Sequence, residues 1–418
     1  MPTPELIRSI DLDAYADVVG EEEIAEIRRL ARSLTGARVQ HVNSTAVGGG
    51  VAEILARLVP LMQQVGLDAR WDVISGSPRY YAVTKAFHNA LHGAEVELDA
   101  ESFRIFDENT RQNLGIVDPD LDFAIIHDPQ PVGLARARNP SKGKWIWRCH
   151  IDLSDADPRV WSFLRPQVER YDAAVFHLPD YAQQLSIPQL LIMPAIDPFS
   201  EKNLELPPEE IARVLERHGI DQKRPIVLQV SRFDRLKDPL GVLRAFQLAR
   251  TWHDCQLVLA GGGAADDPEG ERVLAEVQEA AGGNPDVHIL SLPPDANREI
   301  NALQRGATVI VQKSLREGFG LVVTEAMWKG KPVVGSAVGG IRRQIVDNAT
   351  GFLVHSVEGT AFRIRQLLTN PGLARRLGTA ARQMVIENFL LPTYLKQWTL
   401  ALLAVRQGGR GVTWLETR

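Results

Sequence analysis

The feature that most constrains the fold of this chain is the repeated alternation of short β-branched segments with longer amphipathic segments. Residues 51–66, for example, place apolar side chains at helical spacing between two such short segments. Short, nearly continuous apolar strands separated by helices are typical of a parallel sheet that is covered on both faces. The strands predicted for the first half of the chain are 37–44, 68–75, 122–128, 144–151 and 172–178.

A second series of the same kind follows a segment rich in proline and polar residues at 191–210. Its predicted strands are 226–233, 256–263, 287–292, 307–314, 332–337 and 351–354. The pattern predicts two Rossmann-like, doubly wound α/β domains over 1–198 and 199–390. A helical tail over 391–418 is expected to cross back to the first domain. Because open α/β sheets bind ligands outside the carboxyl ends of their strands, two facing domains would enclose one cleft.

Composition excludes several other classes of protein. The 418 residues carry 47 Lys and Arg against 52 Asp and Glu, a net charge of −5, which argues against a nucleic-acid-binding protein. No uncharged apolar run approaches the roughly 18 residues of a membrane-spanning helix. The N-terminal segment has no uninterrupted apolar core, so we expect a cytoplasmic protein. Cys149 and Cys255 have no partner pattern and are expected to be buried thiols.

The most specific motif lies at 316–340. Glu317 precedes a Gly-Phe-Gly turn, and Glu325 follows eight positions later in a predicted helix. Glycines let a backbone approach a ligand closely, and a helix start offers N–H groups to oxygen-rich ligands. Two carboxylates can accept paired hydrogen bonds from the vicinal hydroxyls of a hexose or a ribose. The alternative is a structural turn with two solvated carboxylates.

Two further loops have the pattern of anion sites. Arg232 and Lys237 follow the apolar run 226–230 of the predicted strand and together suit a diphosphate, although an ordinary basic surface loop would look the same. Their charge would concentrate anions locally in a net acidic protein. The glycine run 48–50, between a strand and a helix, could bring backbone amides to phosphate or sugar oxygens, or could be a plain turn. It is neither a P-loop nor a GxGxxG motif, which weakens an NAD-binding interpretation.

The order and spacing of these motifs resemble the retaining nucleotide-sugar glycosyltransferases of the GT-B fold, whose E-x7-E signature matches Glu317 and Glu325. The resemblance implies that Arg232 and Lys237 bind the donor diphosphate. It also implies that Glu317 contacts the transferred sugar and that Glu325 binds the ribose. The nucleotide-sugar-binding residues expected on this basis are Gly49, Gly50, Arg232, Lys237, Gly262, Leu290, Glu317, Gly318, Phe319, Gly320, Leu321, Val322 and Glu325.

The N-terminal half resembles trehalose-forming enzymes, that is, the glycosyltransferring synthases and the related retaining phosphorylases. The similar stretches are 41–55, 84–89, 125–131 and 147–154. This family places a sugar-binding histidine at the end of the strand 144–151, so we assign His150 a donor- or acceptor-sugar contact and not a general-base role. Structural histidines and a capped turn are the alternatives there. The expected acceptor-binding residues are His88, Asn89, His127, Asp128, Arg148 and Asp152.

The predicted reaction moves glucose from a nucleoside diphosphate glucose to the anomeric hydroxyl of free glucose, with retention, and yields trehalose. The leaving diphosphate would take the acceptor's proton while cationic side chains stabilise its charge. Glu317 and Glu325 are not expected to act as a hydrolase pair, because glycosidase carboxylates flank one bond at a defined separation. The expected catalytic residues are Arg232, Lys237, Glu317 and His150.

No cofactor is expected to be required, since the two cations replace a metal; Mg²⁺ remains open, but the sequence shows no acidic ligand cluster for it. The expected partners are nucleotide glucose, glucose and trehalose, without nucleic acid or membrane, and a homodimer remains open. Three alternatives stay open. The first is a trehalose phosphorylase that uses phosphate and glucose 1-phosphate, and the second is a GT-B transferase with another sugar acceptor. The third is a catalytically silent nucleotide-sugar-binding protein on the same scaffold.

Overall fold

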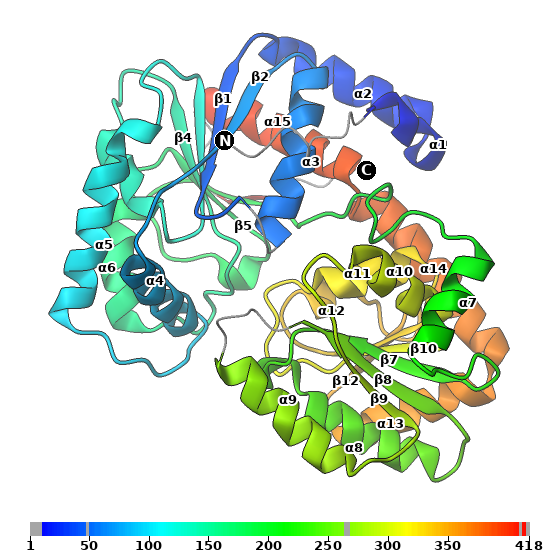
Figure 1. The fold of residues 1–418 in the computed structure, drawn as a ribbon. Helices are drawn as coiled ribbons and strands as arrows, with labels where there is room; N and C mark the ends of the chain where they lie inside the picture. Colours follow the sequence, from blue (N-terminus) through cyan, green and yellow to red (C-terminus); the bar gives the residue numbers. More distant parts are fainter. Residues whose placement is uncertain (1–10, 47–49, 263–267, 409–411, 415–418) are drawn as a thin grey trace. The chain divides into compact units, whose positions relative to one another are not determined.

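The computed structural model describes residues 11–46, 50–262, 268–408 and 412–414 (Figure 1). The chain divides into two compact units. Unit 1 comprises residues 1–195 together with 391–418, and unit 2 comprises residues 196–390. These divisions lie near the predicted boundaries at 198/199 and 390/391, and the C-terminal segment groups with unit 1.

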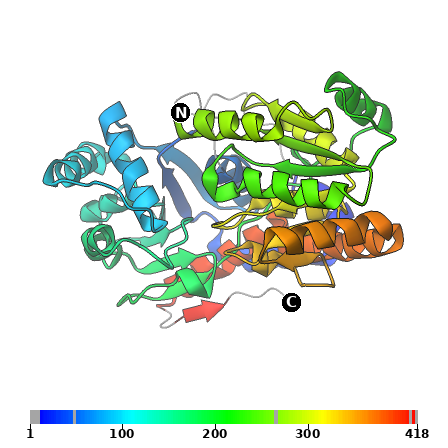
Figure 2. The same ribbon diagram turned by 90° about the horizontal axis from the view of Figure 1, so that it is seen from below.

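Within the described residues, unit 1 contains a seven-stranded sheet in the order β13-β6-β5-β4-β3-β1-β2, and every neighbouring pair is parallel. The strands are β1 Arg38–Asn43, β2 Asp68–Val73, β3 Phe123–His127, β4 Lys144–Arg148, β5 Ala173–Phe176, β6 Gln189–Leu191 and β13 Val412–Trp414. The five strands predicted for this half are all present. The three-residue strands β6 and β13, the latter drawn as the red arrow in Figure 2, were not predicted because they are too short to show a pattern.

Helices cover unit 1 in two groups (Figure 1). α4, α5 and α6 pack together over the large apolar core that includes Phe87, Phe106 and Trp147, while α15 packs on α2 and α3. Helix α15 begins at Leu391, and Pro392 occupies its first turn, where a missing N–H costs nothing. The helices are α1 Ala16–Val19, α2 Glu21–Ala31, α3 Gly50–Gln64, α4 Pro78–Leu91, α5 Ala100–Asn113, α6 Pro158–Val168 and α15 Leu391–Arg406. Short 3-10 turns are η2 Asp13–Tyr15, η3 Arg32–Leu34, η4 Leu114–Ile116, η5 Val132–Ala137 and η6 Pro179–Tyr181.

Unit 2 contains a six-stranded parallel sheet in the order β12-β11-β10-β7-β8-β9. All six strands predicted for this half are present, and each strand ends within the predicted segment. The strands are β7 Ile226–Val230, β8 Gln256–Gly261, β9 Val287–Ser291, β10 Val309–Gln312, β11 Val333–Ser336 and β12 Phe352–Val354. The helices are α7 Pro208–Arg217, α8 Pro239–Arg250, α9 Pro268–Ala281, α10 Asn297–Gly306, α11 Leu321–Trp328, α12 Ile341–Gln344, α13 Val357–Thr369 and α14 Pro371–Asn388, with a 3-10 turn η7 Arg235–Lys237.

Each sheet reverses its strand order at one place. In unit 1 the reversal lies between β1 and β3, and in unit 2 it lies between β7 and β10. Loops that leave the carboxyl ends of two such strands run in opposite directions, which opens a crevice where ligands bind in doubly wound sheets. The two reversal points are therefore where ligand-binding residues are expected in these sheets. Among the described helices, none has the length and apolar character needed to cross a bilayer.

Candidate functional site

The reversal point of unit 2 brings together the two loops that carry its main predicted residues. Lys237 ends the turn that follows β7, and Glu317 lies in the loop that follows β10. The Lys237 ammonium donates to Glu317 Oε2 at 2.7 Å, and both side chains are mostly buried, with 19% and 10% exposed. The structure thus pairs a predicted diphosphate ligand with a predicted sugar ligand.

Glu317 Oε2 receives more than one hydrogen bond. Ser314 Oγ donates to it at 3.1 Å, and Gln312 Nε2 lies at 3.5 Å. Lys237 is held from the other side, because Gln229 Nε2 donates to its backbone carbonyl at 2.8 Å. The carboxylate and the ammonium are therefore positioned by polar groups from both strands at the reversal point. Sequence reasoning missed Gln229, Gln312 and Ser314, although buried polar residues at the ends of apolar strands were a usable signal.

Asp238 anchors the turn that carries Lys237. Its backbone is left-handed, with φ of 47°, and its Oδ1 accepts from Gly241 N at 2.9 Å at the start of α8. Its other carboxylate oxygen pairs with Lys313 of the β10 loop. A second backbone link joins the loops, since Leu315 N donates to Leu236 O at 2.7 Å. The two loops consequently form one rigid unit around the Lys237–Glu317 pair.

The Gly-Phe-Gly turn is shaped by close backbone packing. Gly320 has a φ of 85°, and a Cβ there would lie 3.0 Å from Glu317 Cγ. Gln344 Nε2 donates to the Phe319 carbonyl at 2.5 Å, and a Cβ on Gly340 would lie 2.4 Å from Phe319 Cα. Gly318, whose backbone is predicted to run along the donor, lies between Glu317 and Phe319. The turn needs glycine both for its conformation and for the approach of the next loop.

Other predicted donor residues lie around the same end of the sheet. The Arg232 side chain is 59% exposed and lies within 3.3 Å of Asp234 Oδ2. Gly262 directly follows β8, and a Cβ there would lie 2.5 Å from the Leu292 carbonyl. Leu290 lies in β9, the edge strand beside β8, and is half-buried. Their roles in binding a donor remain predictions.

The predicted ribose ligand has a more enclosed position than the sequence suggested. Leu321 and Val322 form the half-buried first turn of α11, whereas Glu325 lies in the middle of that helix and is only 5% exposed. Lys329, one turn later, donates to Glu325 O at 3.2 Å and to Asn203 Oδ1 at 2.9 Å. Burial lowers the pKa of Lys329 to about 7, and the Glu325 carboxylate opposes that shift. Glu325 thus lies buried near the Lys329 side chain inside unit 2, and its contact with a ribose remains a prediction.

The reversal point of unit 1 contains the acceptor residues predicted at strand ends. Asp128 follows β3 with a left-handed φ of 66°, and its Oδ1 accepts from His150 N at 2.7 Å. Asp128 N donates to Arg148 O at 2.8 Å, which fastens the β3 end to the β4 end. Burial raises the pKa of Asp128 to about 7. This carboxyl group therefore changes its charge near neutral pH.

Arg148 does not have the predicted acceptor-binding position. Its side chain is fully buried and donates to Phe176 O at 2.9 Å and to Ile192 O at 2.7 Å. Both bonds go to backbone carbonyls at the ends of β5 and β6, so the guanidinium joins strands instead of facing a ligand. The sequence suggested a ligand because a charged residue at a strand end is normally solvated. Here carbonyls at the ends of neighbouring parallel strands accept its hydrogen bonds, and the Phe176 carbonyl also accepts from Ile192 N at 2.9 Å.

His127 and His150 also have a different environment from the one predicted. β4 ends at Arg148, so His150 lies in the following loop and not at the end of a strand that runs to 151. His127 Nδ1 and His150 Nε2 lie 3.0 Å apart, and the second nitrogen of each ring contacts another histidine. Neither imidazole therefore presents an unused nitrogen to a sugar in this structure. The additional histidines, His41 and His177, were not singled out from the sequence.

The remaining predicted residues of unit 1 are spread along the chain. Asp152 Oδ1 accepts from Ser154 N at 2.9 Å and closes a local turn. His88 and Asn89 lie in the last turn of α4, where the His88 ring is 4.7 Å from that of His92. Gly50 is the first residue of α3, whereas Gly48 and Gly49 lie outside the described residues. The acceptor roles of Asp152, His88 and Asn89 remain predictions.

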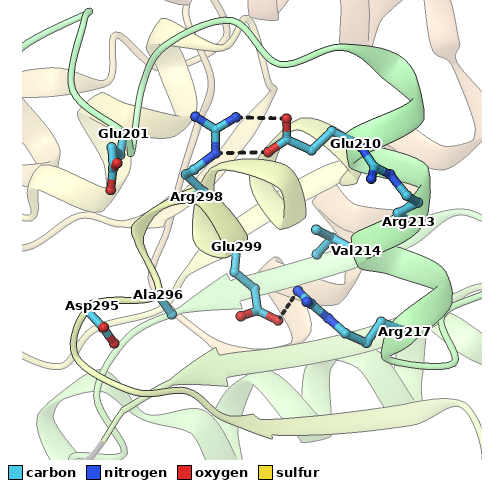
Figure 3. Close-up of a pocket in the computed structure, with 9 residues that line it drawn as sticks. All are labelled: Glu201, Glu210, Arg213, Val214, Arg217, Asp295, Ala296, Arg298 and Glu299. Atoms are coloured by element: carbon cyan, nitrogen blue, oxygen red, sulfur yellow. Dashed lines mark hydrogen bonds and ion pairs between the residues drawn. The ribbon is translucent and has the colours of Figure 1, made fainter.

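Unit 2 also contains a cavity of about 550 Å³, and neither Lys237 nor Glu317 lines it (Figure 3). Arg298 forms a paired contact with Glu210, and Arg217 binds Glu299, so its charges largely neutralise one another. None of the predicted site residues lines it. The lining residues are Glu201, Glu210, Arg213, Val214, Arg217, Asp295, Ala296, Arg298 and Glu299. Within the described ranges, no group of three or more His, Cys, Asp or Glu residues is placed to hold a metal ion.

Comparisons with known proteins give consistent matches for both units. Residues 41–183 match the family model of the trehalose synthase N-terminal domain, and residues 211–384 match that of glycosyl transferases group 1. A trehalose synthase of Pyrococcus horikoshii is 44% identical over 393 residues, which covers 93% of this chain and 94% of the relative. A trehalose synthase of Rubrobacter xylanophilus is 42% identical over 91% of this chain and 94% of the relative.

More distant matches extend the comparison. A trehalose phosphorylase of Pleurotus pulmonarius is 26% identical over 90% of this chain but only 58% of that protein. Among solved structures, the UDP-forming α,α-trehalose-phosphate synthase of Burkholderia xenovorans has a TM-score of 0.70 at 15% identity, covering 88% of this chain and 100% of the other. The sucrose-phosphate synthase of Thermosynechococcus elongatus has a TM-score of 0.68 at 19% identity, covering 89% and 100%. These likenesses show that the fold is GT-B.

Proposed function

Because the chain belongs to the trehalose synthase family of GT-B glycosyltransferases, and is accordingly a trehalose-making hexosyltransferase, we propose that it transfers glucose from a nucleoside diphosphate glucose to free glucose with retention. The observation that carries the proposal is the Lys237–Glu317 pair at the reversal point of the unit 2 sheet. A cation suited to a diphosphate and a carboxylate suited to a sugar hydroxyl lie 2.7 Å apart there.

The reaction requires no covalent enzyme intermediate. The bond between the donor's anomeric carbon and the diphosphate oxygen breaks, and a bond from the same face of that carbon to the acceptor's anomeric oxygen forms. The acceptor's hydroxyl proton passes to the departing diphosphate. Lys237 and Arg232 stabilise the negative charge that grows on the diphosphate, and one preorganised donor is worth about two to three orders of magnitude in such a step.

Glu317 has the role of a sugar ligand in this proposal. Ser314 and Gln312 keep its carboxylate oriented when the diphosphate draws the Lys237 ammonium toward itself. The Gly318–Gly320 backbone, held by Gln344, would run along the sugar and phosphate. Glu325 would bind the ribose, and the backbone near Gly262 and Leu290 would contact the base. The cations take the place of a metal, and no cofactor is required.

Product analysis tests this proposal. The protein is incubated with glucose and, in turn, UDP-, ADP- and GDP-glucose, beside a control with glucose 1-phosphate, and the disaccharide is identified by NMR. We expect trehalose with both anomeric centres in the α configuration from at least one nucleotide glucose. Trehalose from glucose 1-phosphate alone would instead establish the phosphorylase reaction, which the 26% identity to fungal trehalose phosphorylases keeps as the second candidate.

A matched pair of variants tests the role of the cation. Lys237→Ala should lower transfer by about a hundredfold or more, whereas Arg235→Ala should leave it unchanged. Arg235 belongs to the same 3-10 turn, but its guanidinium binds Glu276 on α9 at 2.6 Å instead of Glu317. Equal activity of the two variants would remove the proposed diphosphate site. Nucleotide-glucose binding without any disaccharide from glucose or other sugars would favour a silent binding protein.

A further inference from the structure

Four histidines form one continuous hydrogen-bonded chain across unit 1. His41 Nδ1 lies 3.0 Å from His127 Nε2, and His127 Nδ1 lies 3.0 Å from His150 Nε2. His150 Nδ1 in turn lies 3.3 Å from His177 Nε2. The chain follows the strand order β1, β3, β4, β5, because each ring comes from one of these strands or from the loop directly after it. Its far end is His41 Nε2, which lies 3.4 Å from Met62 Sδ in α3.

The methionine determines the direction of every hydrogen bond in this chain. A neutral imidazole has one N–H donor and one bare acceptor nitrogen, and a thioether can only accept. His41 must therefore carry its proton on Nε2, toward Met62, and keep Nδ1 bare. That bare nitrogen accepts from His127 Nε2–H. His127 Nδ1 then accepts from His150 Nε2–H, and His150 Nδ1 accepts from His177 Nε2–H. All four rings are consequently Nε2–H tautomers.

The chain holds its rings neutral and does not conduct protons. A doubly protonated ring would turn an N–H toward the N–H of its neighbour and break one link. Burial lowers the pKa of His41 to about 3, and it lowers the pKa of His127 and His150 well below the usual range. The buried Arg148 guanidinium opposes protonation of both His127 and His150. A relay would also need a way out, and Met62 in the apolar core closes that end.

The groups around the chain come from several elements. Trp398 of α15 lies with its ring centroid 6.1 Å from that of His41, and Tyr181 of η6 lies 6.4 Å from His177. The Asp128 carboxylate accepts from the His150 backbone N–H and so lies next to the chain. His150 is the most exposed of the four histidines and is half-buried, whereas His41, His127 and His177 are at most 3% exposed.

We propose that His41, His127 and Met62 are positioning residues that hold His150 as an Nε2–H imidazole, so that His150 Nδ1 is purely a hydrogen-bond acceptor toward a sugar hydroxyl. His177 Nε2–H is the internal donor to this nitrogen, and its 3.3 Å link is the longest of the three between rings. A sugar hydroxyl would replace it. This inference rests on the proposed function, because it takes the strand-end region of Asp128 and His150 as a sugar site.

Nitrogen-15 NMR of the histidine rings tests the tautomers in the full chain at pH 7.5. We expect His150 to show a protonated Nε2 and a bare Nδ1. Met62→Leu removes the acceptor while keeping the volume of the side chain, so a fraction of the rings should reverse to the Nδ1–H form. Leu61→Met, the adjacent buried position of α3, is the matched control and should leave all four rings unchanged. A protonated Nδ1 on His150 in the unaltered protein would overturn the proposal.

Steady-state kinetics separates positioning from a general loss of structure. Met62→Leu and His41→Phe should raise the KM of the one sugar substrate that meets His150, glucose or the nucleotide glucose, in proportion to the fraction of His150 rings that reverse. The rise should reach about tenfold, the factor expected for one lost hydrogen bond, when nearly all of them reverse. The other KM should stay within twofold. His41→Asn, whose carbonyl oxygen can accept from His127, should restore the normal KM. If His41→Phe does not fold, Met62→Leu still decides the question.

The outcomes separate this inference from the proposed function. If the unaltered protein forms no trehalose from any nucleotide glucose, the proposed function fails while the tautomer measurement still stands. If trehalose forms but Met62→Leu changes neither the tautomers nor either KM, the positioning role fails while the function stands. A parallel rise of both KM values would show a structural effect and would also contradict the positioning role.

Discussion

At the scale of single residues, the chemistry proposed for unit 2 depends on one mostly buried ion pair. Lys237 and Glu317 are mostly buried, and the carboxylate has further hydrogen bonds from Ser314 and Gln312. A buried pair with one partner removed leaves an uncompensated charge, which costs more than the loss of a surface ion pair. Substitutions at either residue should therefore change both the chemistry and the local geometry.

Lys237→Ala is expected to lower kcat by about a hundredfold or more, because the departing diphosphate loses a preorganised cation. Turnover with the best nucleotide glucose measures the effect. Circular dichroism serves as the folding control. A kcat within threefold of the unaltered protein would contradict the assignment of Lys237 to the diphosphate.

Asp128 should make the affinity for a sugar depend on pH near neutrality. Its pKa is raised to about 7, so the carboxylate, the better acceptor for a hydroxyl, dominates above that pH and is lost below it. The KM for glucose should fall several-fold between pH 6 and pH 8. Asp128→Asn, which keeps an oxygen for the His150 N–H, should flatten this dependence. A variant with the same pH profile as the unaltered protein would show that Asp128 does not titrate at the sugar site.

At the scale of secondary-structure elements, the loops at strand ends carry the main residues of both proposed sites. The β7 and β10 loops are fastened by the Lys313–Asp238 pair and by the Leu315–Leu236 backbone bond. In unit 1, Asp128 and Arg148 fasten the ends of β3, β4, β5 and β6. Side chains in such loops are positioned as a group, so a change in one loop should affect residues of the next.

Gly320→Ala tests this coupling in the Gly-Phe-Gly turn. The φ of 85° is costly for alanine by roughly 1–2 kcal/mol, and its Cβ would meet Glu317 Cγ at 3.0 Å. We expect a lower melting temperature together with at least tenfold weaker kcat/KM for the nucleotide glucose. Gly359→Ala is the control, because its Cβ would meet only Ser356 Oγ, at 3.5 Å. An unchanged kcat/KM in Gly320→Ala would show that the Gly-Phe-Gly turn does not take part in binding the nucleotide glucose.

The histidine chain should make unit 1 sensitive to acid. The pKa of His41 is about 3 in the fold, and unfolding restores a value near 6.5. The unfolded chain thus binds more protons below pH 6.5, and the free energy of unfolding falls as the pH falls. Each buried neutral histidine adds a slope of about 1.4 kcal/mol per pH unit in that range. Urea unfolding between pH 7 and pH 5 should be less steeply pH-dependent for His41→Asn, and an equal slope would contradict this origin.

At the scale of the whole molecule, the C-terminal segment completes the N-terminal unit. α15 packs on α2 and α3, and Lys396 binds Glu23 at 2.9 Å and Glu26 at 2.6 Å. Trp398, fully buried, lies beside His41. Unit 1 is thus built from two separate parts of the chain, and its core needs both of them.

Truncation tests that dependence. A chain that ends at Leu390 loses the buried Tyr394, Leu395, Trp398 and Leu402, so unit 1 should lose its cooperative melting transition. A chain that ends at Gly408 keeps α15 and should retain that transition with a smaller loss of stability. Differential scanning calorimetry measures both chains. Cooperative melting of unit 1 in the shorter chain would show that α15 is dispensable.

The alternation of strands and helices was predictable because buried parallel strands are continuous apolar runs, and all eleven strands predicted in the two series are present. The sequence placed Lys237 and Glu317 after two predicted strands. That these two strands, β7 and β10, are neighbours, so that the side chains are in contact, was known only from the strand order of the sheet. The bonds of Arg148 to the Phe176 and Ile192 carbonyls could not be predicted, because the sequence does not show which strand ends lie beside its guanidinium.

The sequence by itself determined the class of the fold, the two series of strands and the motifs at their carboxyl ends, because each of these is a local pattern of apolar, glycine and charged residues. Only the tertiary structure decided that His41, His127, His150 and His177 form one chain, since they lie far apart in the sequence. They become neighbours because β1, β3, β4 and β5 are adjacent in the sheet, and Met62 from a helix then determines their protons.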